Sequence, residues 1–305
     1  MSLIKRSTDL ELPKTVKVMI YGQAGMGKTT LALSTPSPLL IDFDGGVRRV
    51  STAYLESAGI VQVSDWAEVK QLLTEDLSEF RTVIVDTVGK MMDYITAYVC
   101  GGRAPQMRDW TAINREFQWL CSELGRMGKH CIFVAHRDTR REGEETVFVP
   151  TLREKNLNTI VTELDLLGYL EMRSENGRQV RTVTFDPTSR NEGKNTCGLP
   201  SVMQIPNLAD GMQNDFLTKS VIIPYQQKLE ANETKMKEFA SRKEDICLYV
   251  AQITDAEGAN SFSEYIKEQK ATGTLLAYAR SEFSKRVAEL GLAYDKRSKR
   301  YTHPA

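Results

Sequence analysis

The sequence lacks an excess of charge of either sign, and this absence limits what it can encode. Its 305 residues include 40 Lys and Arg against 40 Asp and Glu, so the formal net charge is zero. This balance disfavours a protein that coats nucleic acid through bulk positive charge, although a local basic groove is compatible with it. With 41% hydrophobic and 26% charged residues, the composition is that of a soluble globular protein and excludes a disordered chain.

Long apolar runs, paired cysteines and clustered histidines are also missing. No uninterrupted apolar segment approaches the roughly 20 residues of a membrane span, and the first residues lack the apolar core of a secretory signal. The five cysteines form no C-x-x-C pair, which predicts reduced, mostly buried thiols and a cytoplasmic location. Three histidines are too few for a His-rich metal site. We therefore expect no membrane partner.

Apolar strands and amphipathic helices are predicted to alternate through the first two-thirds of the chain. Apolar, β-branched runs indicate buried strands at residues 15–21, 39–43, 60–63, 82–85 and 131–135. The spacing of apolar residues predicts helices at residues 28–34, 65–77, 88–99 and 111–127. This alternation is typical of βαβ units and of a mainly parallel sheet that helices cover on both faces.

The sequence changes character after the last of these strands. Turn signals at Glu142-Gly143 and Asn176-Gly177 predict antiparallel hairpins that extend one edge of the sheet. From about residue 213 onward Gly and Pro become scarce, and helical stripes of apolar residues dominate. We therefore predict an α/β core over residues 1–212 and a mostly helical C-terminal extension over residues 213–305.

The most specific motif is a glycine-rich phosphate-binding loop. Residues 22–29 form a complete G-x-x-x-x-G-K-[ST] pattern between a predicted strand and a predicted helix. The glycines let backbone N–H groups converge on phosphate oxygens, and the helix adds its positive dipole end. We expect Lys28 to reach the β- and γ-phosphates and the Thr29 hydroxyl to bind Mg²⁺. The predicted nucleotide-binding residues are Gly22, Gln23, Ala24, Gly25, Met26, Gly27, Lys28, Thr29 and Thr30.

A carboxylate that follows a buried strand is the candidate second ligand for the metal. Asp86 ends the apolar run at residues 83–85, the Walker B arrangement. A parallel strand beside the loop strand would hold this carboxylate near Mg²⁺. The alternative is that Asp86 only caps the helix that follows.

Two further strand ends carry candidates for catalysis. Asp42 and Asp44 end the strand after the loop helix and share one face, and Asp44 lies further toward the edge where ligands of such sheets bind. Asp44 is therefore the candidate general base or water-positioning residue, unless Asp44-Gly45-Gly46 is merely a turn. His136 ends a later strand and could hydrogen-bond the γ-phosphate, with a purely structural histidine as the alternative.

The order of these motifs resembles that of RecA-like phage recombination ATPases, specifically the Sak group of single-strand annealing proteins related to RecA and UvsX. The resemblance covers about residues 14–206 and rests on the loop, on residues 40–44, 83–87 and 132–136, and on residues 193–196. It implies a RecA-like P-loop core, ATP and Mg²⁺ as cofactors, and single-stranded DNA as a partner. It also implies a filament or ring with ATP between subunits, and the bacterial host cytoplasm as the location of a phage-encoded protein.

The resemblance also implies roles for individual residues. Asp44 matches the RecA glutamate that acts on the attacking water, but it is one methylene shorter, so hydrolysis is expected to be slow. His136 stands where RecA has a glutamine that senses the γ-phosphate. Lys194 looks like a lysine that reaches the neighbouring subunit's phosphates, whereas Thr196 stands in place of a second one.

The candidate DNA contacts are arginines in two loops that follow the Asp86 and His136 strands. RecA-like proteins hold DNA with mobile loops at these places, and arginine beside glycine suits a phosphate-gripping loop. The second loop also contains three glutamates, so a solvated hairpin is the alternative. The candidates are Arg103, Arg108, Arg137, Arg140 and Arg141.

The sequence thus predicts a Mg²⁺-dependent RecA-like ATPase that binds single-stranded DNA and supports phage-type recombination or strand annealing. One alternative is a nucleotide-switched assembly protein with little hydrolysis, because Asp44 is short. The other is a P-loop kinase or phosphotransferase, which would require an arginine-bearing lid.

Overall fold

The computed structural model describes residues 14–175, 177–208 and 212–303. They fall into two compact units, the first ending at Gln227 and the second beginning at Lys228. The sequence placed this division between residues 212 and 213. Residues after 212 pack with the first unit because Phe216, Leu217 and Val221 are buried in its core.

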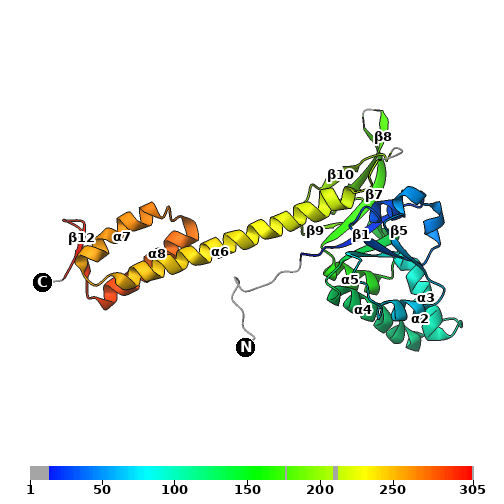
Figure 1. The fold of residues 1–305 in the computed structure, drawn as a ribbon, viewed down its shortest axis with the longest axis horizontal. Coiled ribbons are helices and arrows are strands. Elements are labelled where there is room, and N and C mark those ends of the chain that lie inside the picture. The colour runs from blue at the N-terminus through cyan, green and yellow to red at the C-terminus, as the bar shows by residue number, and fades with distance from the viewer. Residues whose placement is uncertain (1–13, 176, 209–211, 304–305) are drawn as a thin grey trace. The chain divides into compact units, whose positions relative to one another are not determined.

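A single mixed sheet forms the centre of the first unit (Figure 1). Its strands run in the order β10-β8-β7-β1-β5-β4-β2-β3, and β1, β2, β3, β4, β5 and β7 pair in parallel. The strands are β1 Lys17–Gly22, β2 Pro38–Asp42, β3 Gly59–Gln62, β4 Thr82–Asp86, β5 His130–Glu142, β6 Glu145–Pro150, β7 Leu166–Glu175, β8 Arg178–Thr184, β9 Lys194–Asn195 and β10 Val202–Ile205.

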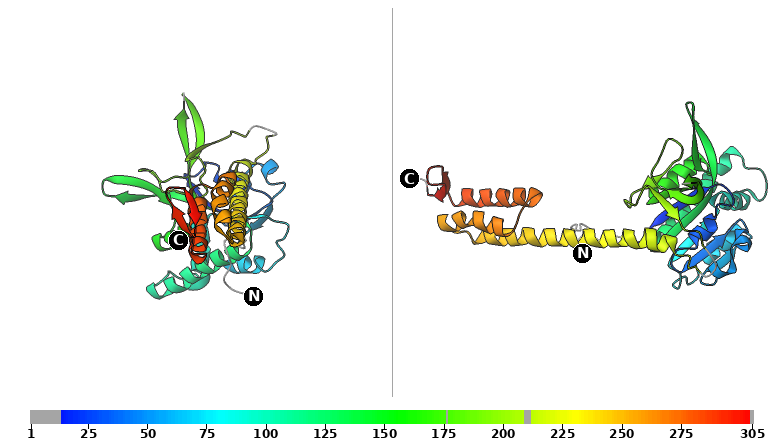
Figure 2. Two further views of the ribbon diagram at one scale, coloured as in Figure 1. Left: turned by 90° about the vertical axis from the view of Figure 1, so that its left-hand side faces the viewer. Right: turned by 90° about the horizontal axis from the view of Figure 1, so that it is seen from above.

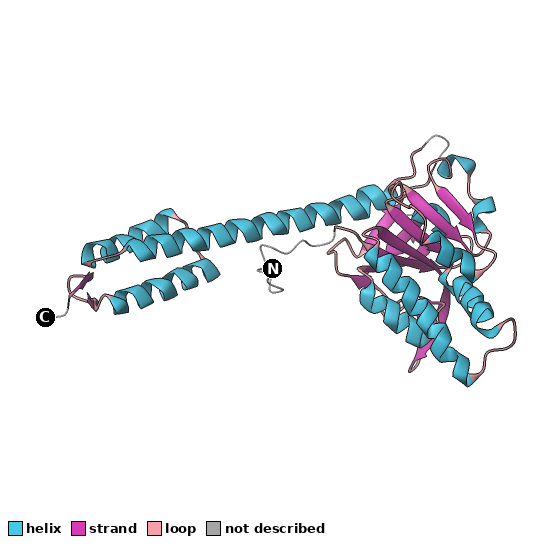
Figure 3. Cartoon of the chain, turned by 60° about the horizontal axis from the view of Figure 1, so that its bottom comes forward, coloured by secondary structure: helices cyan, strands magenta, loops and turns pink. Residues whose placement is uncertain are grey.

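Helices cover both faces of this sheet, as Figure 3 shows. They are α1 Lys28–Ala32, α2 Trp66–Leu72, α3 Val88–Cys100, α4 Trp110–Arg126 and α5 Glu154–Glu163, with short 3₁₀ turns at Gly46–Arg49, Thr52–Tyr54 and Met107–Asp109. Side chains of successive β1 residues point to opposite faces of the sheet. Met19 packs in the hydrophobic cluster on one face, and Val18 and Ile20 pack in the cluster on the other. This burial on both faces explains why the parallel strands are continuously apolar.

The position of β4 differs from the sequence prediction. The strand that ends in Asp86 was expected beside the loop strand β1, but β5 lies between them and pairs with both. The sequence does not reveal the order of the strands in the sheet, because a strand that follows a crossover helix can be added on either side of the strand before it. All three strands run parallel, so their carboxyl ends still meet at one edge of the sheet.

Hairpins extend the sheet on the side of β7. Strand β8 pairs antiparallel with β7, and β10 with β8. Asn176 of the predicted second turn lies outside the described residues, but the pairing of Glu175 with Arg178 confirms the hairpin. The turn signal at Glu142-Gly143 is also confirmed as a hairpin, in which β5 continues past His136 and pairs with β6. This hairpin extends the interior strand β5 and not an edge of the sheet, and it takes the place of the mobile DNA-binding loop that the resemblance implied.

The second unit has its own hydrophobic core, formed by the distal part of α6 (Ile223–Gln252) together with α7 (Ala256–Glu268) and α8 (Gly273–Glu289) (Figure 2). Helix α6 continues directly from a π-helical turn at Thr218–Ile222. Ile246, Phe262 and Phe283 lie at the centre of this core. The aromatic and basic segment at 294–301 forms a hairpin of β11 (Ala293–Asp295) and β12 (Arg300–Thr302). The helical prediction for this unit therefore holds for all but its last segment.

Two further expectations concern thiols and membranes. All five cysteines are free, and Cys100, Cys121, Cys131 and Cys197 are buried, which confirms the prediction of mostly buried, reduced thiols. No helix in the described part of the chain combines the length and the hydrophobicity that crossing a membrane requires.

Candidate nucleotide-binding site

The phosphate-binding loop joins β1 to α1 at the carboxyl edge of the sheet. Gly25 and Gly27 both adopt left-handed backbone (φ 78°), which glycine reaches without a Cβ clash. The Lys28 ammonium turns back under the loop and donates to the carbonyl oxygens of Gly22 (3.1 Å) and Gln23 (2.9 Å). Burial lowers the pKa of Lys28, and the carboxylates of Asp86 and Asp44 oppose that shift. The lysine is therefore held inside the cradle that the loop forms.

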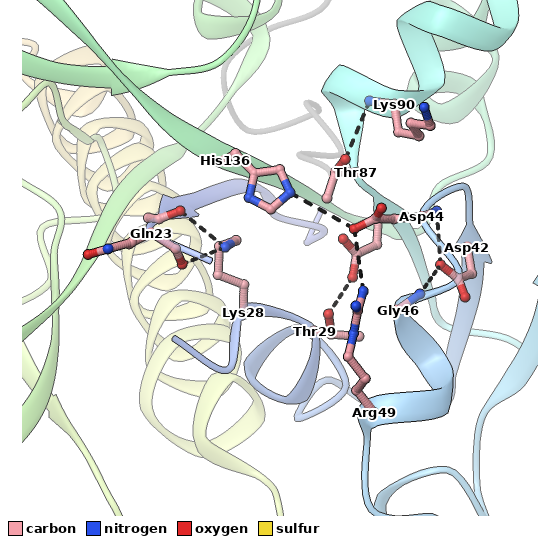
Figure 4. Close-up of polar contacts among 12 residues, drawn as sticks. Gln23, Lys28, Thr29, Asp42, Asp44, Gly46, Arg49, Thr87, Lys90 and His136 are labelled. Carbon is pink, nitrogen blue, oxygen red and sulfur yellow. Dashed lines mark hydrogen bonds and ion pairs between the residues drawn. The ribbon is translucent and has the colours of Figure 1, made fainter. Parts of the chain in front are cut away.

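Thr29 and Asp86 form the closest polar pair at this edge. The Thr29 hydroxyl donates to Asp86 Oδ2 at 2.6 Å (Figure 4). Burial raises the pKa of Asp86 to about 6, with smaller contributions from the nearby Asp42 and Asp44 charges; the Thr29 hydrogen bond and Lys28 oppose the shift. A carboxylate buried in this way gains from a cation, because a positive charge offsets the cost of desolvation.

The Thr29–Asp86 pair suits Mg²⁺ rather than a metal that needs a full protein cage. Among the residues that the structure describes, no group of three or more His, Cys, Asp or Glu side chains could hold a metal ion. Mg²⁺ is commonly bound by one or two protein oxygen ligands, with waters and substrate phosphates completing its shell. One hydroxyl and one carboxylate beside a phosphate loop match that requirement.

Asp42 and Asp44 have different environments despite their alternate spacing. Asp42 is buried and accepts backbone hydrogen bonds from Asp44 (3.2 Å), Gly46 (3.1 Å) and Val47 (3.2 Å), so it fixes the turn that follows β2. The Asp44 side chain is 35% exposed and faces the loop. Phe43 points the other way and stacks on Trp66 in the core, as alternation predicts.

Asp44 lies between two basic side chains. Its Oδ2 atom is 3.9 Å from His136 Nε2 and 3.9 Å from the Arg49 guanidinium (Figure 4). Burial lowers the pKa of His136, Lys28 adds to this shift, and Asp44 opposes it, so the imidazole is neutral at neutral pH. The β1–β5 register pairs Gly22 with His136, which brings the histidine to the loop as predicted.

Lys194 is not part of this cluster. It pairs with Leu167 near the start of β7, whereas the loop residue Gly22 pairs with Leu170 further along the same strand. Its ammonium donates to the carbonyls of Val161 (2.7 Å) and Thr162 (3.1 Å) at the end of α5. Within its own chain Lys194 therefore stabilises a helix C-terminus and does not contact the phosphate loop.

Three of the five candidate DNA-binding arginines already have partners. Arg103 makes a bidentate pair with Asp109 (2.6 and 2.8 Å), and Arg140 contacts Glu142 and Glu192. Arg137 donates to the Tyr169 hydroxyl and lies over the Phe148 ring at 4.2 Å. Arg108 and Arg141 are exposed, and no ion pair of either is seen within the described residues.

Arg181 on β8 is a site residue that the sequence did not reveal. Its guanidinium donates to the Met26 carbonyl at 3.3 Å, and its Nε atom is buried without a hydrogen-bond partner. The guanidinium lies where a Cβ at Gly27 would be, but a flexible arginine could move aside, so it is the left-handed backbone of Gly27 (φ 78°) that favours glycine there. Desolvation lowers the pKa of Arg181, and no carboxylate forms an ion pair with it within the described residues. No local pattern marks it, since it follows the loop by 155 residues.

The strand order and this edge define a RecA-like P-loop ATPase fold. From β7 to β2 the order is β7-β1-β5-β4-β2, with the phosphate loop after β1 and the Asp86 carboxylate after β4. The family model described as "AAA domain" matches residues 14–197, which is more than half of the chain, and the chain belongs to that family.

One curated relative and two solved structures are similar to the chain. The "SPbeta prophage-derived uncharacterized protein YorG" of Bacillus subtilis (strain 168) is 25% identical over 175 residues. The match covers 52% of this chain and 51% of the relative, so the chain spans about half of that protein's length.

The two structures cover similar parts of the chain. The KaiC-like protein PH0186 from Pyrococcus horikoshii OT3 has a TM-score of 0.36 at 15% identity, over 55% of this chain and 77% of its own. The flagellar accessory protein FlaH from Methanocaldococcus jannaschii has a TM-score of 0.37 at 11% identity, over 63% of this chain and 90% of its own.

Proposed function

We propose that this protein hydrolyses ATP with Mg²⁺ and couples hydrolysis to single-stranded DNA in phage-type recombination or strand annealing, as in the Sak group. One observation carries the ATPase part: Lys28, the Thr29–Asp86 pair and Asp44 meet at one edge of the sheet. These are the groups that phosphoryl transfer to water needs, namely a cation for the phosphates, oxygen ligands for the metal and a base.

In the proposed site each side chain has one task. Lys28 and the loop N–H groups bind the β- and γ-phosphates, and Thr29 and Asp86 hold Mg²⁺, which neutralises charge that develops on the phosphate oxygens. Asp44 accepts a proton from the attacking water, and Arg49, whose guanidinium is 3.9 Å from its Oδ2 atom, orients the carboxylate. His136, neutral and on the strand between β1 and β4, is placed to hydrogen-bond the γ-phosphate.

The DNA part of the proposal rests on fewer arginines of the first unit than the sequence implied. Arg108 and Arg141 are the candidates left after the partners of the other three arginines are considered. Because the chain has no net charge, its affinity for DNA must come from a few cations that assembly into a filament or ring multiplies. The prophage origin of the curated relative supports a phage-type role in a bacterial cytoplasm.

The proposal is tested by the ATPase rate of the full chain with and without single-stranded DNA. We expect DNA to raise turnover, and Asp44→Ala to lower it by about 10²–10⁴-fold, the usual contribution of a general base. Asp93→Ala is the matched control, because that carboxylate is exposed on α3 and its one ion pair within the described residues is with Lys90.

Two outcomes would change the assignment. Turnover and oligomer size that both ignore DNA would remove the DNA half of the proposal. Tight ATP binding with negligible turnover that Asp44→Ala does not alter would instead indicate a nucleotide-switched assembly protein.

A further inference from the structure

The C-terminal unit contains a cavity of about 740 Å³ that none of the ATPase motifs uses. Residues of α7, α8 and the β11–β12 hairpin line it. Its volume lies within the range of about 300–1,000 Å³ that is usual for ligand-binding sites.

Charge around this cavity is of one sign. Lys267, Lys270, Arg280 and Lys299 line it, whereas no Asp or Glu does. Within the described residues none of these four side chains forms an ion pair, although Lys285 and Arg286 on the same helix α8 as Arg280 pair with Glu282 and Glu289. The cavity wall therefore carries cations and no carboxylate, which favours an anionic ligand.

Two of these lysines occupy strained backbone. Lys270 (φ 48°) and Lys299 (φ 53°) are in the left-handed region, which glycine adopts without cost. Lys270 follows the end of α7, where the Ala271 N–H donates to the Ile266 carbonyl (3.3 Å), and Lys299 lies in the turn between β11 and β12. The helix end and the hairpin turn therefore fix the backbone of these two lysines at the cavity.

Aromatic rings form the inner wall and part of the rim. Phe262 and Phe283 stack at 4.1 Å between ring centres, and Tyr301 meets Phe283 edge-on at 5.2 Å. Tyr294 lies 5.1 Å from Tyr301 and is 51% exposed, so one of its ring faces is open to a ligand. An exposed aromatic ring among unpaired cations is the combination that binds a base and its phosphates.

The hairpin that carries Tyr294, Lys299 and Tyr301 is fixed to α7. The Tyr301 backbone N–H donates to Asn260 Oδ1 at 2.8 Å, and Asn260 Nδ2 donates to the Tyr301 carbonyl at 3.1 Å. This reciprocal pair holds the rim in place, so the cavity is built before a ligand arrives and binding orders few groups.

We propose that this cavity is a binding site for single-stranded nucleic acid. A base stacks on Tyr294, and the adjacent phosphates contact Lys270, Arg280 and Lys299. A strand is favoured over an acidic peptide because the cations are interleaved with aromatic rings, which a carboxylate does not require. This inference rests on the DNA-binding part of the proposed function, and it moves the main contact from the two ATPase loops to the C-terminal unit.

The test is fluorescence anisotropy of the full-length protein with a labelled oligo(dT) of about 20 nucleotides, long enough for a stacked site. We expect the double variant Lys270→Glu/Arg280→Glu to bind at least about tenfold more weakly, with a slope of log affinity against log salt smaller by about 1.4. Tyr294→Ala should cost about tenfold through lost stacking. Lys235→Glu/Lys237→Glu on α6 makes the same charge change away from the cavity and should alter affinity less than about twofold.

The possible outcomes distinguish the cavity inference from the proposed DNA function. If the cavity variant binds the strand as tightly as the α6 control while the wild type binds well, the cavity inference is wrong and the DNA function stands. If a mononucleotide or poly-glutamate competes as well as the strand, the cavity is a small-anion or peptide site, which also overturns the inference. A wild type that binds no strand removes both the cavity inference and the DNA function. A far-UV circular dichroism spectrum and thermal melt equal to those of the wild type report that the C-terminal unit of each cavity variant is folded. The basal ATPase rate judges the ATPase function separately.

Discussion

The two cationic sites of this chain differ in what surrounds their lysines and arginines. At the phosphate loop, Lys28 lies among the carboxylates of Asp42, Asp44 and Asp86. In the C-terminal cavity, four cations line a surface with no carboxylate. The first arrangement has an excess of carboxylates before any ligand binds, whereas the second has only cations.

This difference indicates different ligands. A site with several carboxylates repels a bare phosphate unless a divalent cation accompanies it, so the loop favours a metal–nucleotide complex. Unpaired cations at a surface attract a polyanion directly and lose that attraction as salt rises. The ATPase site should therefore depend on Mg²⁺, and the cavity on ionic strength.

The largest difference between the two sites should come from Lys28→Met, which removes the cation at the loop and leaves the cavity unchanged. We expect turnover to fall by about 10²–10³-fold, the usual cost of losing one preorganised electrostatic contact. Strand binding in the absence of nucleotide should stay within about twofold of the wild type, because the variant does not touch the unit that carries the cavity.

Steady-state ATPase kinetics measure the loss of turnover, and fluorescence anisotropy on the same sample measures strand binding. A parallel loss of nucleotide-free strand binding would contradict the separation of the sites, and would indicate that DNA binds at the loop edge.

The sequence predicted the loop edge well because its motifs are local. A strand, a glycine loop and a helix start occur in one stretch, and Asp86 and His136 each end an apolar run, so parallel pairing alone brings them to the same edge. The order of the strands was not predictable, since the position of β5 between β1 and β4 depends on which way a crossover turns.

Acid should destabilise the ATPase unit through His130. This side chain is 6% exposed, its Nδ1 accepts the Val16 N–H at 3.0 Å, and burial lowers its pKa to about 4, helped by Arg81. Above about pH 6.5 the imidazole is neutral in both folded and unfolded chains. As pH falls from about 6.5 to 4 the unfolded chain binds the His130 proton first, so His130 contributes a loss of about 3 kcal/mol of stability. Asp86, whose pKa burial raises to about 6, contributes in the opposite sense between about pH 6 and 4, so the His130 contribution is read from a comparison of variants.

Tryptophan fluorescence isolates this unit, because all three tryptophans, Trp66, Trp110 and Trp119, belong to it. Urea titrations at several pH values should show that the wild type loses stability relative to His130→Gln as pH falls from about 6.5 to 4, because the variant has no imidazole to protonate and retains an acceptor for Val16. Identical slopes in the two proteins would show that His130 does not cause the loss.

Arg181→Gln should weaken ATP binding by about tenfold, with less change in kcat. The half-buried guanidinium lies against the Met26 carbonyl and has no carboxylate partner, so phosphate at the loop is its natural counter-charge. Calorimetric titration with Mg²⁺–ATP measures the affinity. Arg178→Gln, exposed at the start of the same strand, is the matched control, and equal affinity in both variants would make Arg181 purely structural.

The sequence also could not predict which arginines are already paired with other side chains. The five arginines looked equivalent in their loops, yet Arg103 and Arg140 form ion pairs and Arg137 stacks on a ring. Asp109 lies six residues after Arg103, so the sequence could have indicated that pair. Glu192 lies 52 residues after Arg140, and no local pattern connects the two. Only the fold shows which cations are still available to a ligand.

The smallest expected effect is a difference in strand binding between variants of two neighbouring arginines on the β5–β6 hairpin. Arg141 is exposed and free of ion pairs among the described residues, whereas Arg140 is held by Glu142 and Glu192. Arg141→Gln should weaken strand binding by about two- to threefold and lower the salt slope by about 0.7, the value of one phosphate contact on single strands. Arg140→Gln should leave affinity unchanged, because its charge is already neutralised. If instead Arg141→Gln costs more than the cavity variant, the ATPase unit holds the strand and the C-terminal cavity is secondary.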